Sequence, residues 1–379
     1  MAPSVTRKRP AAVFFAALFA ILLYFVLFPY PLGKEYVVRP AWAVTVPAPG
    51  DPGASASPAG ETGLAPFRSG ALFGYVDARG RFAHVEKVLA QAALSDAGFV
   101  NYTRLGTDWI MYDPRGARML SFSGSGYPFL GPDTGRIFVV KSDLGGLTEI
   151  DRGGDVLWSR DFPALLTTLS VRGDALLAGF INGRLLMLDS KGTALFDGLP
   201  AGAASAGTSR IPVALGAAAS PDGRRAASIG GIDPQVLSVF ERVGSTFVQR
   251  SSERLASDFR REARISFSPD GRFIAFEGPD SGSLYDPLAS RAVSLPLLGQ
   301  VAGIAFPGQG RFAAFVARVD GTPQPGQPAG AADLLVTRPF VGTVFRESFP
   351  VGDLFVGTVD GQLLIGLDGR LLRMDVVSL

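Results

Sequence analysis

The sequence predicts an all-β fold, a β-propeller of seven (alternatively eight) four-stranded blades, preceded by one transmembrane helix. Three observations carry this prediction. Glycine and proline are abundant, at 47 and 28 of 379 residues, and only 18% of residues are charged, a composition typical of short apolar strands joined by tight turns. A unit containing such turns recurs about every 40 residues, as four-stranded blades do. A long, uncharged apolar run lies close to the N-terminus.

The apolar run extends from Ala11 to Phe28 and contains no charge, glycine or proline. A helix over residues 11–30, rising about 1.5 Å per residue, spans most of a hydrocarbon core about 30 Å thick. The basic triplet Arg7-Lys8-Arg9 precedes the run, and the flank after it is only weakly charged. The positive-inside rule therefore places residues 1–10 in the cytoplasm and the rest of the chain outside it.

A cleaved signal peptide is the alternative, because Ala41-Trp42-Ala43 fits a small-x-small cleavage site. That site lies well beyond the apolar run, and the run is longer than most signal-peptide cores, so an uncleaved signal anchor is favoured. Both alternatives export the remainder of the chain. Residues 31–66 are rich in proline, alanine and glycine, and after Val44 they carry almost no large apolar side chain. We expect them to form a disordered tether.

Residues 67–379 contain the repeated units of the predicted propeller. The two clearest units begin at Gly173 and Gly352, and each reads as a strand, an Asn-Gly or Asp-Gly turn, a second strand, an aspartate turn and a third strand. Such turns between apolar runs are strong hairpin signals. A second version of the unit has a proline-containing turn followed by Gly-Arg, and it begins at Ala218, Ile265 and Ile304.

Together these units predict blades that begin near Lys87, Tyr127, Leu165, Pro212, Arg264, Val301 and Thr343. An additional hairpin from Leu72 either donates outer strands that close the ring or completes an eighth blade, and seven blades are favoured. Closure pairs the first blade with the last and removes exposed sheet edges. A β-sandwich does not need a unit of this period and a β-helix has shorter rungs, so the propeller is preferred over both.

Two of the units resemble known propeller families. The stretch ISFSPDGRFIAF from Ile265 resembles the blade motif of WD-repeat and TolB-like propellers, and IDRGGDVLWSRDF from Ile150 resembles the PQQ-like repeat. The resemblance implies the propeller fold and implies that Trp158 packs between neighbouring blades. The resemblance gives almost no information about function. Quinoprotein dehydrogenases use a vicinal cysteine pair, and the noncatalytic PQQ-like lipoprotein of outer-membrane assembly carries a lipid on a cysteine, whereas this chain has no cysteine. A helical anchor would replace that lipid.

The sequence offers little for catalysis. With no cysteine and one histidine, His84, thiol chemistry and histidine-rich metal sites are excluded. The stretch Gly124-Ser125-Gly126 lacks the G-x-S-x-G spacing of a serine nucleophile, and no calcium-loop or phosphate-loop motif occurs. We therefore predict no enzyme activity, catalytic residue, metal or cofactor. The aspartates that recur in turns are expected to stabilise those turns, and they are Asp113, Asp151, Asp189, Asp222, Asp270, Asp286, Asp360 and Asp368.

Two insertions interrupt the compact units. Residues 249–264 are rich in charge, and Leu255 and Phe259 fall at helical spacing, so a short amphipathic helix on the rim is expected. As a partner-docking segment it offers Arg250, Arg254, Phe259, Arg260, Arg261 and Arg264. Residues 319–332 are rich in proline and glycine, and we expect a flexible loop between strands.

These features predict a non-catalytic, membrane-anchored propeller that acts as a protein-binding or scaffold module of the cell envelope. It is expected in the inner membrane as a single-pass protein, with the propeller in the periplasm or extracytoplasmic space and an envelope protein as partner. A ligand-binding sensor or enzyme that uses the central channel is the alternative, and a glycan-binding domain is a weaker one. The basic residues are scattered and the net charge is +2, so nucleic acid is not expected as a partner.

Overall fold

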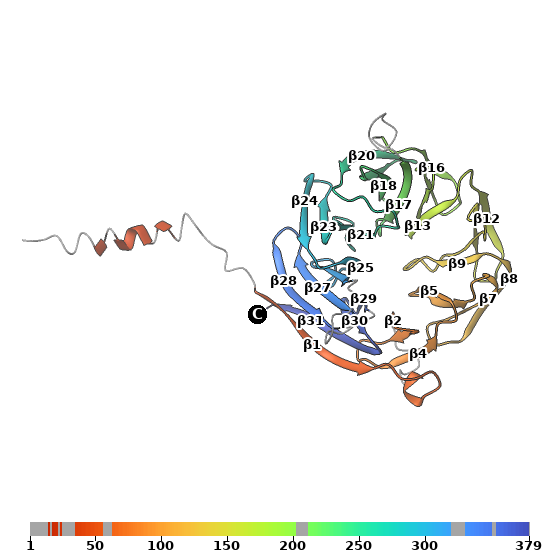
Figure 1. Cartoon of the computed structure of the whole chain (residues 1–379), viewed down its shortest axis with the longest axis horizontal. Coiled ribbons are helices and arrows are strands. Elements are labelled where there is room, and N and C mark those ends of the chain that lie inside the picture. The colour runs from red at the N-terminus through yellow and green to blue at the C-terminus, as the bar shows by residue number, and fades with distance from the viewer. Residues whose placement is uncertain are drawn as a thin grey trace, which may run out of the picture. The chain divides into compact units, whose positions relative to one another are not determined.

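The computed structural model describes residues 35–55, 63–201, 211–319, 330–350 and 354–378, together with short helical fragments within 14–24. The chain divides into two units, residues 1–37 with 377–379, and residues 38–376. The second unit contains the ring of sheets that Figure 1 shows face-on.

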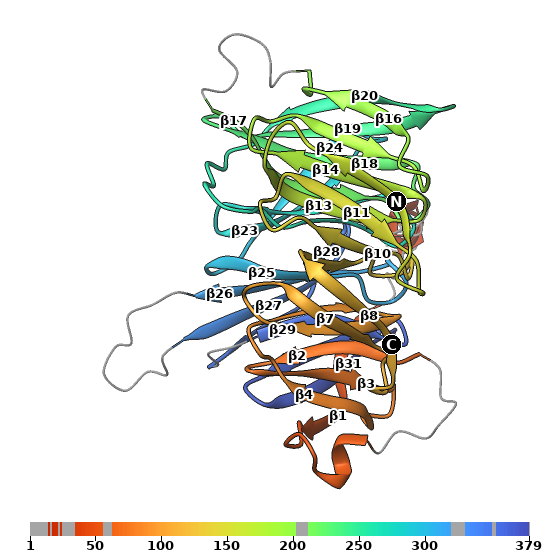
Figure 2. The same cartoon turned by 90° about the vertical axis from the view of Figure 1, so that its right-hand side faces the viewer.

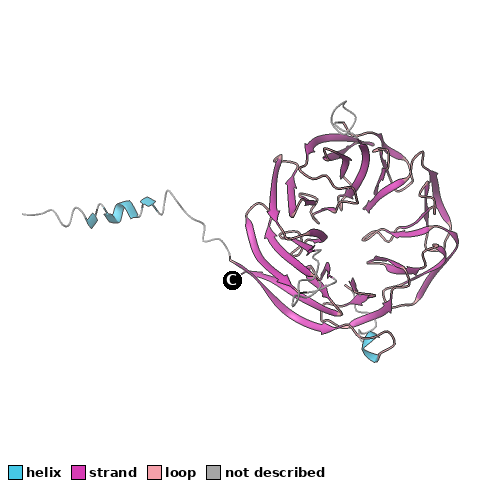
Figure 3. Ribbon diagram, viewed as in Figure 1, coloured by secondary structure: helices cyan, strands magenta, loops and turns pink. Residues whose placement is uncertain are grey.

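The described residues form eight sheets, each a blade of a β-propeller, and seven of the sheets have four strands. Figure 3 shows that strands make up nearly all of the ring. In chain order blade 1 is β2 (Ala65–Ser69), β3 (Leu72–Val76) and β4 (Phe82–Lys87); blade 2 is β5 (Gln91–Ser95), β6 (Gly98–Tyr102), β7 (Thr107–Tyr112) and β8 (Arg118–Ser125); blade 3 is β9 (Tyr127–Leu130), β10 (Ile137–Val140), β11 (Gly146–Ile150) and β12 (Val156–Asp161); blade 4 is β13 (Leu166–Arg172), β14 (Ala175–Phe180), β15 (Leu185–Leu188) and β16 (Ala194–Gly198).

The second half of the ring follows the same plan. Blade 5 is β17 (Ile211–Ala219), β18 (Arg225–Ile232), β19 (Val236–Val243) and β20 (Thr246–Arg254); blade 6 is β21 (Ile265–Phe267), β22 (Ile274–Gly278), β23 (Ser281–Asp286) and β24 (Arg291–Pro296); blade 7 is β25 (Gln300–Ala305), β26 (Ala313–Val319), β27 (Ala331–Arg338) and β28 (Gly342–Phe349); blade 8 is β29 (Leu354–Val359), β30 (Gln362–Leu367) and β31 (Arg370–Ser378), completed by β1 (Tyr36–Thr45).

The preferred number of seven blades is wrong, and the alternative of eight is correct. The hairpin from Leu72 belongs to this additional blade, as that alternative stated, because β3 and β4 pair with β2 to form blade 1. The unit expected to begin near Thr343 begins at Leu354, since Thr343 lies inside β28, the outermost strand of blade 7. Most of the other predicted starts lie close to the first strand of a blade.

The N-terminal strand β1 closes the ring as the outermost strand of blade 8, next to β31. The prediction of a disordered tether over 31–66 is therefore wrong for β1 and for residues 46–55, while residues 56–62 lie outside the described residues. Trp42 Nε1–H donates to the Ala78 carbonyl at 2.9 Å, and Val46 N–H donates to the Gly369 carbonyl at 2.8 Å. A short 3-10 helix, η1 (Pro52–Ser55), follows. The propeller thus begins at β1 and not at residue 67.

The predicted transmembrane helix over 11–30 falls largely outside the described residues, which there are only Phe14, Phe15, 17–21, Leu23 and Tyr24. In the described part of the chain, no helix has both the length and the apolar character needed to cross a bilayer. Most of the loop over 319–332 also lies outside the described residues.

Aspartate turns join the last two strands of blades 1 to 4. In each turn one carboxylate oxygen accepts the N–H groups of the residues two and four positions later, at 2.8–3.0 Å. The four residues are Asp77, Asp113, Asp151 and Asp189. Carboxylates also accept backbone N–H groups in the turns of Asp222, Asp270 and Asp286. The predicted role of these aspartates as turn stabilisers is confirmed, since each satisfies orphan backbone donors.

Neighbouring blades are joined by apolar side chains, and Trp158 on β12 is one of them. It packs with residues of blades 3 and 4 such as Phe138 and Leu188, as the PQQ-like resemblance implies. Beneath its ring lies Gly192, in the turn between β15 and β16, where φ is +76° and an added Cβ would lie 2.8 Å from the indole.

We expect Gly192→Ala to lower the free energy of unfolding by about 2–4 kcal/mol, because positive-φ strain and overpacking against Trp158 add together. The control is Gly244→Ala, at φ +62° with no atom within 4 Å of its added Cβ, where only the strain of about 1–2 kcal/mol applies. Urea unfolding of both variants measures the difference. Equal losses in the free energy of unfolding of the two variants would show that overpacking against Trp158 adds nothing to the strain.

Candidate binding cavities of the channel

The innermost strands run parallel around the channel, and this arrangement defines its two ends. The first residues of β25 and β29 line one cavity together with Arg264, which precedes β21. The last residues of β21, β25 and β29, with Phe267, Ala305 and Thr358 among them, line a different cavity. We call these the first end and the second end of the channel.

The cavity at the first end has a volume of about 630 Å³ and is lined by three arginines. Arg68 comes from β2, Arg264 from the linker before β21 and Arg318 from β26, so the ring brings together side chains from blades 1, 6 and 7. None of the described residues that line it is acidic. We call it the arginine cavity, and arginine is a side chain that proteins commonly use to bind carboxylates and phosphates.

Arg261 lies behind this cavity and holds the linker in place. Its guanidinium donates to both carboxylate oxygens of Glu277, at 2.9 and 2.5 Å, and Glu277 is only 1% exposed. With its amide oriented to satisfy its neighbours, Gln300 also accepts from Arg261 at 3.1 Å. The backbone N–H of Arg264 donates to Glu277 at 3.3 Å. Glu277 therefore neutralises Arg261 and fixes the backbone from which Arg264 extends.

The expected amphipathic helix over 249–264 is wrong. Its first part is the end of strand β20, which pairs with β19, and its second part is an irregular linker. Arg250 lies on β20, the outermost strand of blade 5, and pairs with Glu241 on β19 at 2.9 Å. Arg254 ends that strand, and Phe259 packs partly buried against a cluster formed by blades 5 and 6.

Six residues were predicted for docking. Arg264 lines the arginine cavity, and Arg261 supports the linker beside it. The other four do not line the cavity: Arg250, Arg254 and Phe259 lie elsewhere, and Arg260 is exposed on the linker. The sequence analysis missed Arg68, Gln300 and Arg318. No motif marks them, because each is a single polar residue near the end of an inner strand.

A second cavity of about 550 Å³ lies at the second end, between blades 8 and 2. Asp96, Asp113 and Asp360 line it, together with Arg115. Burial raises the pKa of Asp96, and the nearby Asp133 carboxylate adds to this effect while Arg172 opposes it. We call this the aspartate cavity. The two cavities thus differ in the charge of the side chains that line them.

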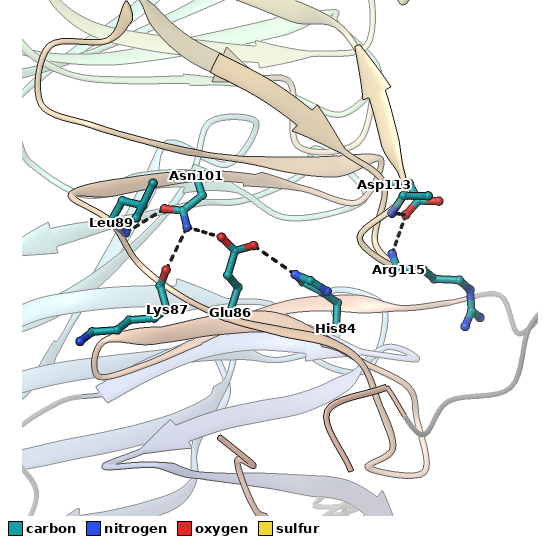
Figure 4. A network of polar contacts seen from close by, with 8 residues as sticks. His84, Glu86, Lys87, Leu89, Asn101, Asp113 and Arg115 are labelled. Atoms are coloured by element: carbon teal, nitrogen blue, oxygen red, sulfur yellow. Dashed lines mark hydrogen bonds and ion pairs between the residues drawn. The ribbon is translucent and has the colours of Figure 1, made fainter. Parts of the chain in front are cut away.

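His84 on β4 joins blades 1 and 2 in a network that Figure 4 shows from close by. Its ring stacks on Phe99 with 4.9 Å between centroids, and Nε2 lies 3.2 Å from a Glu86 oxygen. Asn101 donates to the other Glu86 oxygen at 2.6 Å. The hydrogen bond from His84 lowers the pKa of Glu86, and Asn101 adds to this against the effect of burial. The single histidine is therefore an inter-blade contact.

Metal-ligating side chains do not gather in groups of three or more anywhere in the described ranges. The charged groups that line the two cavities are three arginines at the first end and, at the second, three aspartates with one arginine.

Comparison with known proteins agrees with the fold. An uncharacterized protein from Treponema pallidum (strain Nichols) is 23% identical over 307 residues, which are 79% of this chain and 78% of that protein. The crystal structure of BamB from Moraxella catarrhalis superposes with a TM-score of 0.55 at 13% identity, over 89% of this chain and 98% of that one, a likeness of fold alone. A family model described as beta-propeller protein matches residues 5–378. The chain therefore belongs to this family of beta-propeller proteins.

Proposed function

We propose that this chain is a non-catalytic scaffold propeller of the cell envelope, which binds an acidic segment of a protein partner at the first end of its channel. The observation that carries the proposal is the arginine cavity. Three arginines line a space of about 630 Å³, and none of its described lining residues carries a carboxylate. Arginine is the preferred side chain for recognising carboxylates at interfaces, and a propeller presents such a cavity on a rigid ring.

The N-terminal sequence supports the proposed location. Its uncharged apolar run behind a basic triplet fits a single-pass anchor in the inner membrane, with the propeller in the periplasm or extracytoplasmic space. Tethering raises the effective concentration of partners in the same membrane. Because β1 begins at Tyr36, few residues separate this anchor from the ring.

A ligand-binding sensor or enzyme that uses the central channel is the second candidate. The same cavity favours it, since three arginines also suit a small anionic ligand. A small dicarboxylate or phosphate that raises the melting temperature of the wild-type chain, but not of a variant with reversed cavity charge, would support this candidate.

Affinity capture with the full chain from solubilised membranes tests the scaffold proposal. We expect the wild type to retain a reproducible partner, and the double variant Arg68→Glu/Arg264→Glu to retain about tenfold less, because charge reversal replaces attraction with repulsion. The matched control, Arg250→Glu/Arg254→Glu, reverses two exposed charges on β20 and is expected to bind as the wild type does. Unchanged capture by the cavity variant, or no reproducible partner, would refute the proposal.

A further inference from the structure

The outermost strands contact the next blade at a recurrent position. The blades follow one another around the ring, as Figure 2 shows from the side. In blade 3 the contact is made by Trp158, which pairs with Glu149, two residues before the turn aspartate Asp151. Its indole packs over Gly192 in the turn between the last two strands of blade 4. We call the place that Trp158 occupies the wedge position, because its side chain fills the gap between two blades.

Large side chains recur at the wedge position. The same register, two residues before the first residue of the turn, places there His84, Leu120, Phe196 and Phe345 of blades 1, 2, 4 and 7. An added Cβ at Gly116, in the turn of blade 2, would lie 2.7 Å from the His84 ring, and one at Gly154, in the turn of blade 3, would lie 3.8 Å from Leu120. A wedge side chain against the next turn is therefore a repeated contact between blades.

The boundary between blades 6 and 7 departs from this pattern on both sides. Val293 occupies the wedge position of blade 6, paired with Leu284, and it is smaller than the other wedge side chains. In the turn of blade 7 beside it, Val341 N–H donates to the Arg338 carbonyl at 3.0 Å, and Phe340 has a φ of +59°. Glycine or asparagine normally takes the positive φ of such a turn, and a bulky side chain there is an outlier. Backbone strain of this kind clusters at active sites and ligand clamps.

The small wedge side chain leaves an open groove of about 280 Å³ between the two blades. Val293 and Leu295 line it from β24, and Phe340 and Val341 line it from the turn of blade 7. Val341 is 70% exposed, whereas the other three pack partly buried against the core beneath. Pockets for drug-sized ligands have about 300–1,000 Å³, so this groove suits a single large side chain.

One arginine supplies the charge of the groove. Arg291 begins β24, and its guanidinium lies 4.1 Å from the centroid of the Phe340 ring. The Phe273 ring supports Phe340, with 5.5 Å between the two centroids. Among the described residues, the guanidinium of Arg291 has this ring and no carboxylate as its partner, and no acidic residue lines the groove. A guanidinium stacked on an aromatic ring keeps N–H groups that can bind a carboxylate.

We propose that this groove is a docking site for a partner segment that inserts a large aromatic side chain between blades 6 and 7 and pairs a neighbouring carboxylate with Arg291. The aromatic side chain takes the space that Trp158 fills between blades 3 and 4. The carboxylate pairs with a guanidinium that Phe340 already holds in place. The site goes beyond the proposed function, because none of its residues lines the arginine cavity.

Fluorescence anisotropy with a short labelled peptide tests this site. The peptide carries one tryptophan followed by two glutamates, between glycine and serine residues. The full chain, in detergent, carries Arg68→Glu/Arg264→Glu so that the arginine cavity does not bind the glutamates. We expect saturable binding to this background chain. Replacing the tryptophan of the peptide by alanine should abolish binding, and replacing its glutamates by lysines should weaken binding at least about tenfold.

Variants of the groove, made in the same background, separate insertion from general attraction. Val293→Trp gives blade 6 the wedge side chain of blade 3, so we expect binding at least about tenfold weaker with the melting temperature kept. Arg291→Ala should weaken binding about tenfold, the loss of one charged hydrogen bond. Val341→Glu, at an exposed residue, should do the same through repulsion. The matched controls Val248→Glu and Arg184→Ala, at exposed residues of blades 5 and 4, should bind as the background chain does.

No binding of the peptide, equal binding of its alanine form, or unchanged binding by Arg291→Ala and Val341→Glu would overturn the inference. If Val293→Trp does not fold, those two variants decide. A wild-type dimer in sedimentation that Val341→Glu dissociates, without peptide binding, would assign the groove to a second copy of the chain and also overturn the inference. Partner capture depends on Arg68 and Arg264 and peptide binding on the groove, so each proposal can fail while the other stands.

Discussion

A chain that begins at Val46 is expected to lose cooperative unfolding, whereas a chain that begins at Tyr36 keeps it. Both lack the N-terminal apolar run, but only the shorter one lacks β1, the closing strand of blade 8. Its removal uncovers the edge of β31 and deletes Trp42, which packs against the cluster between blades 8 and 1. Losing a fully buried aromatic costs about 3–5 kcal/mol. Trp42 is half-buried, so its own loss costs less, but the lost pairing of β1 with β31 adds to it, against the 5–15 kcal/mol that stabilises a typical protein.

Urea unfolding followed by circular dichroism and by tryptophan fluorescence measures the effect. The control is Trp42→Ala in the chain that begins at Tyr36, which removes the indole and its hydrogen bond to Ala78 but keeps the β1 backbone. It should fall between the two truncated chains. Identical unfolding curves for the chains beginning at Tyr36 and Val46 would contradict closure by β1.

Arg136→Ala is expected to lower the free energy of unfolding by about 3–5 kcal/mol, because it leaves a buried carboxylate without its partner. Arg136 donates to both oxygens of Glu149, at 2.7 and 2.8 Å, and Glu149 is 4% exposed. The guanidinium also lies 5.0 Å from the Phe138 ring centroid and donates to the Asp174 carbonyl of blade 4. The pair thus connects blades 3 and 4.

Arg184→Ala is the matched control, since Arg184 pairs with Asp197 at 2.7 Å with both side chains 40% exposed or more. We expect it to cost no more than about 1 kcal/mol. The double variant Arg136→Met/Glu149→Leu removes both charges and should recover most of the loss. Calorimetric melting of the three variants measures these differences in stability. Similar losses for Arg136→Ala and Arg184→Ala would show that burial of Glu149 does not set the energy.

The repeats predicted the fold because turn chemistry is local. The aspartates at 113, 151 and 189 stabilise their turns through N–H groups two and four residues away, so short sequence windows contain the whole signal. Closure by β1 left no such signal. Pro40 lies within that strand, and a segment rich in proline and glycine follows it, so its composition resembles a linker although its side chains pack in the ring.

The blade number and the cavity depend on long-range geometry. Blade 1 has only three strands in the described residues, so the sequence before Lys87 holds no complete four-stranded unit to count. Arg68, Arg264 and Arg318 meet only because the closed ring places blade 1 near blades 6 and 7. Each is a single arginine in an otherwise ordinary strand or linker. The high charge of residues 249–264 instead predicted a docking segment there, and most of these residues lie away from the cavity.

Site-specific photo-crosslinking tests most directly whether a partner docks in the channel. A photoreactive residue replaces Ala302, which lines the arginine cavity without contributing its charge, and, as control, Val248 on the outermost strand β20, which is 40% exposed. We predict one reproducible protein adduct from position 302 and none from position 248. An adduct from position 248 with none from position 302 would contradict docking in the channel.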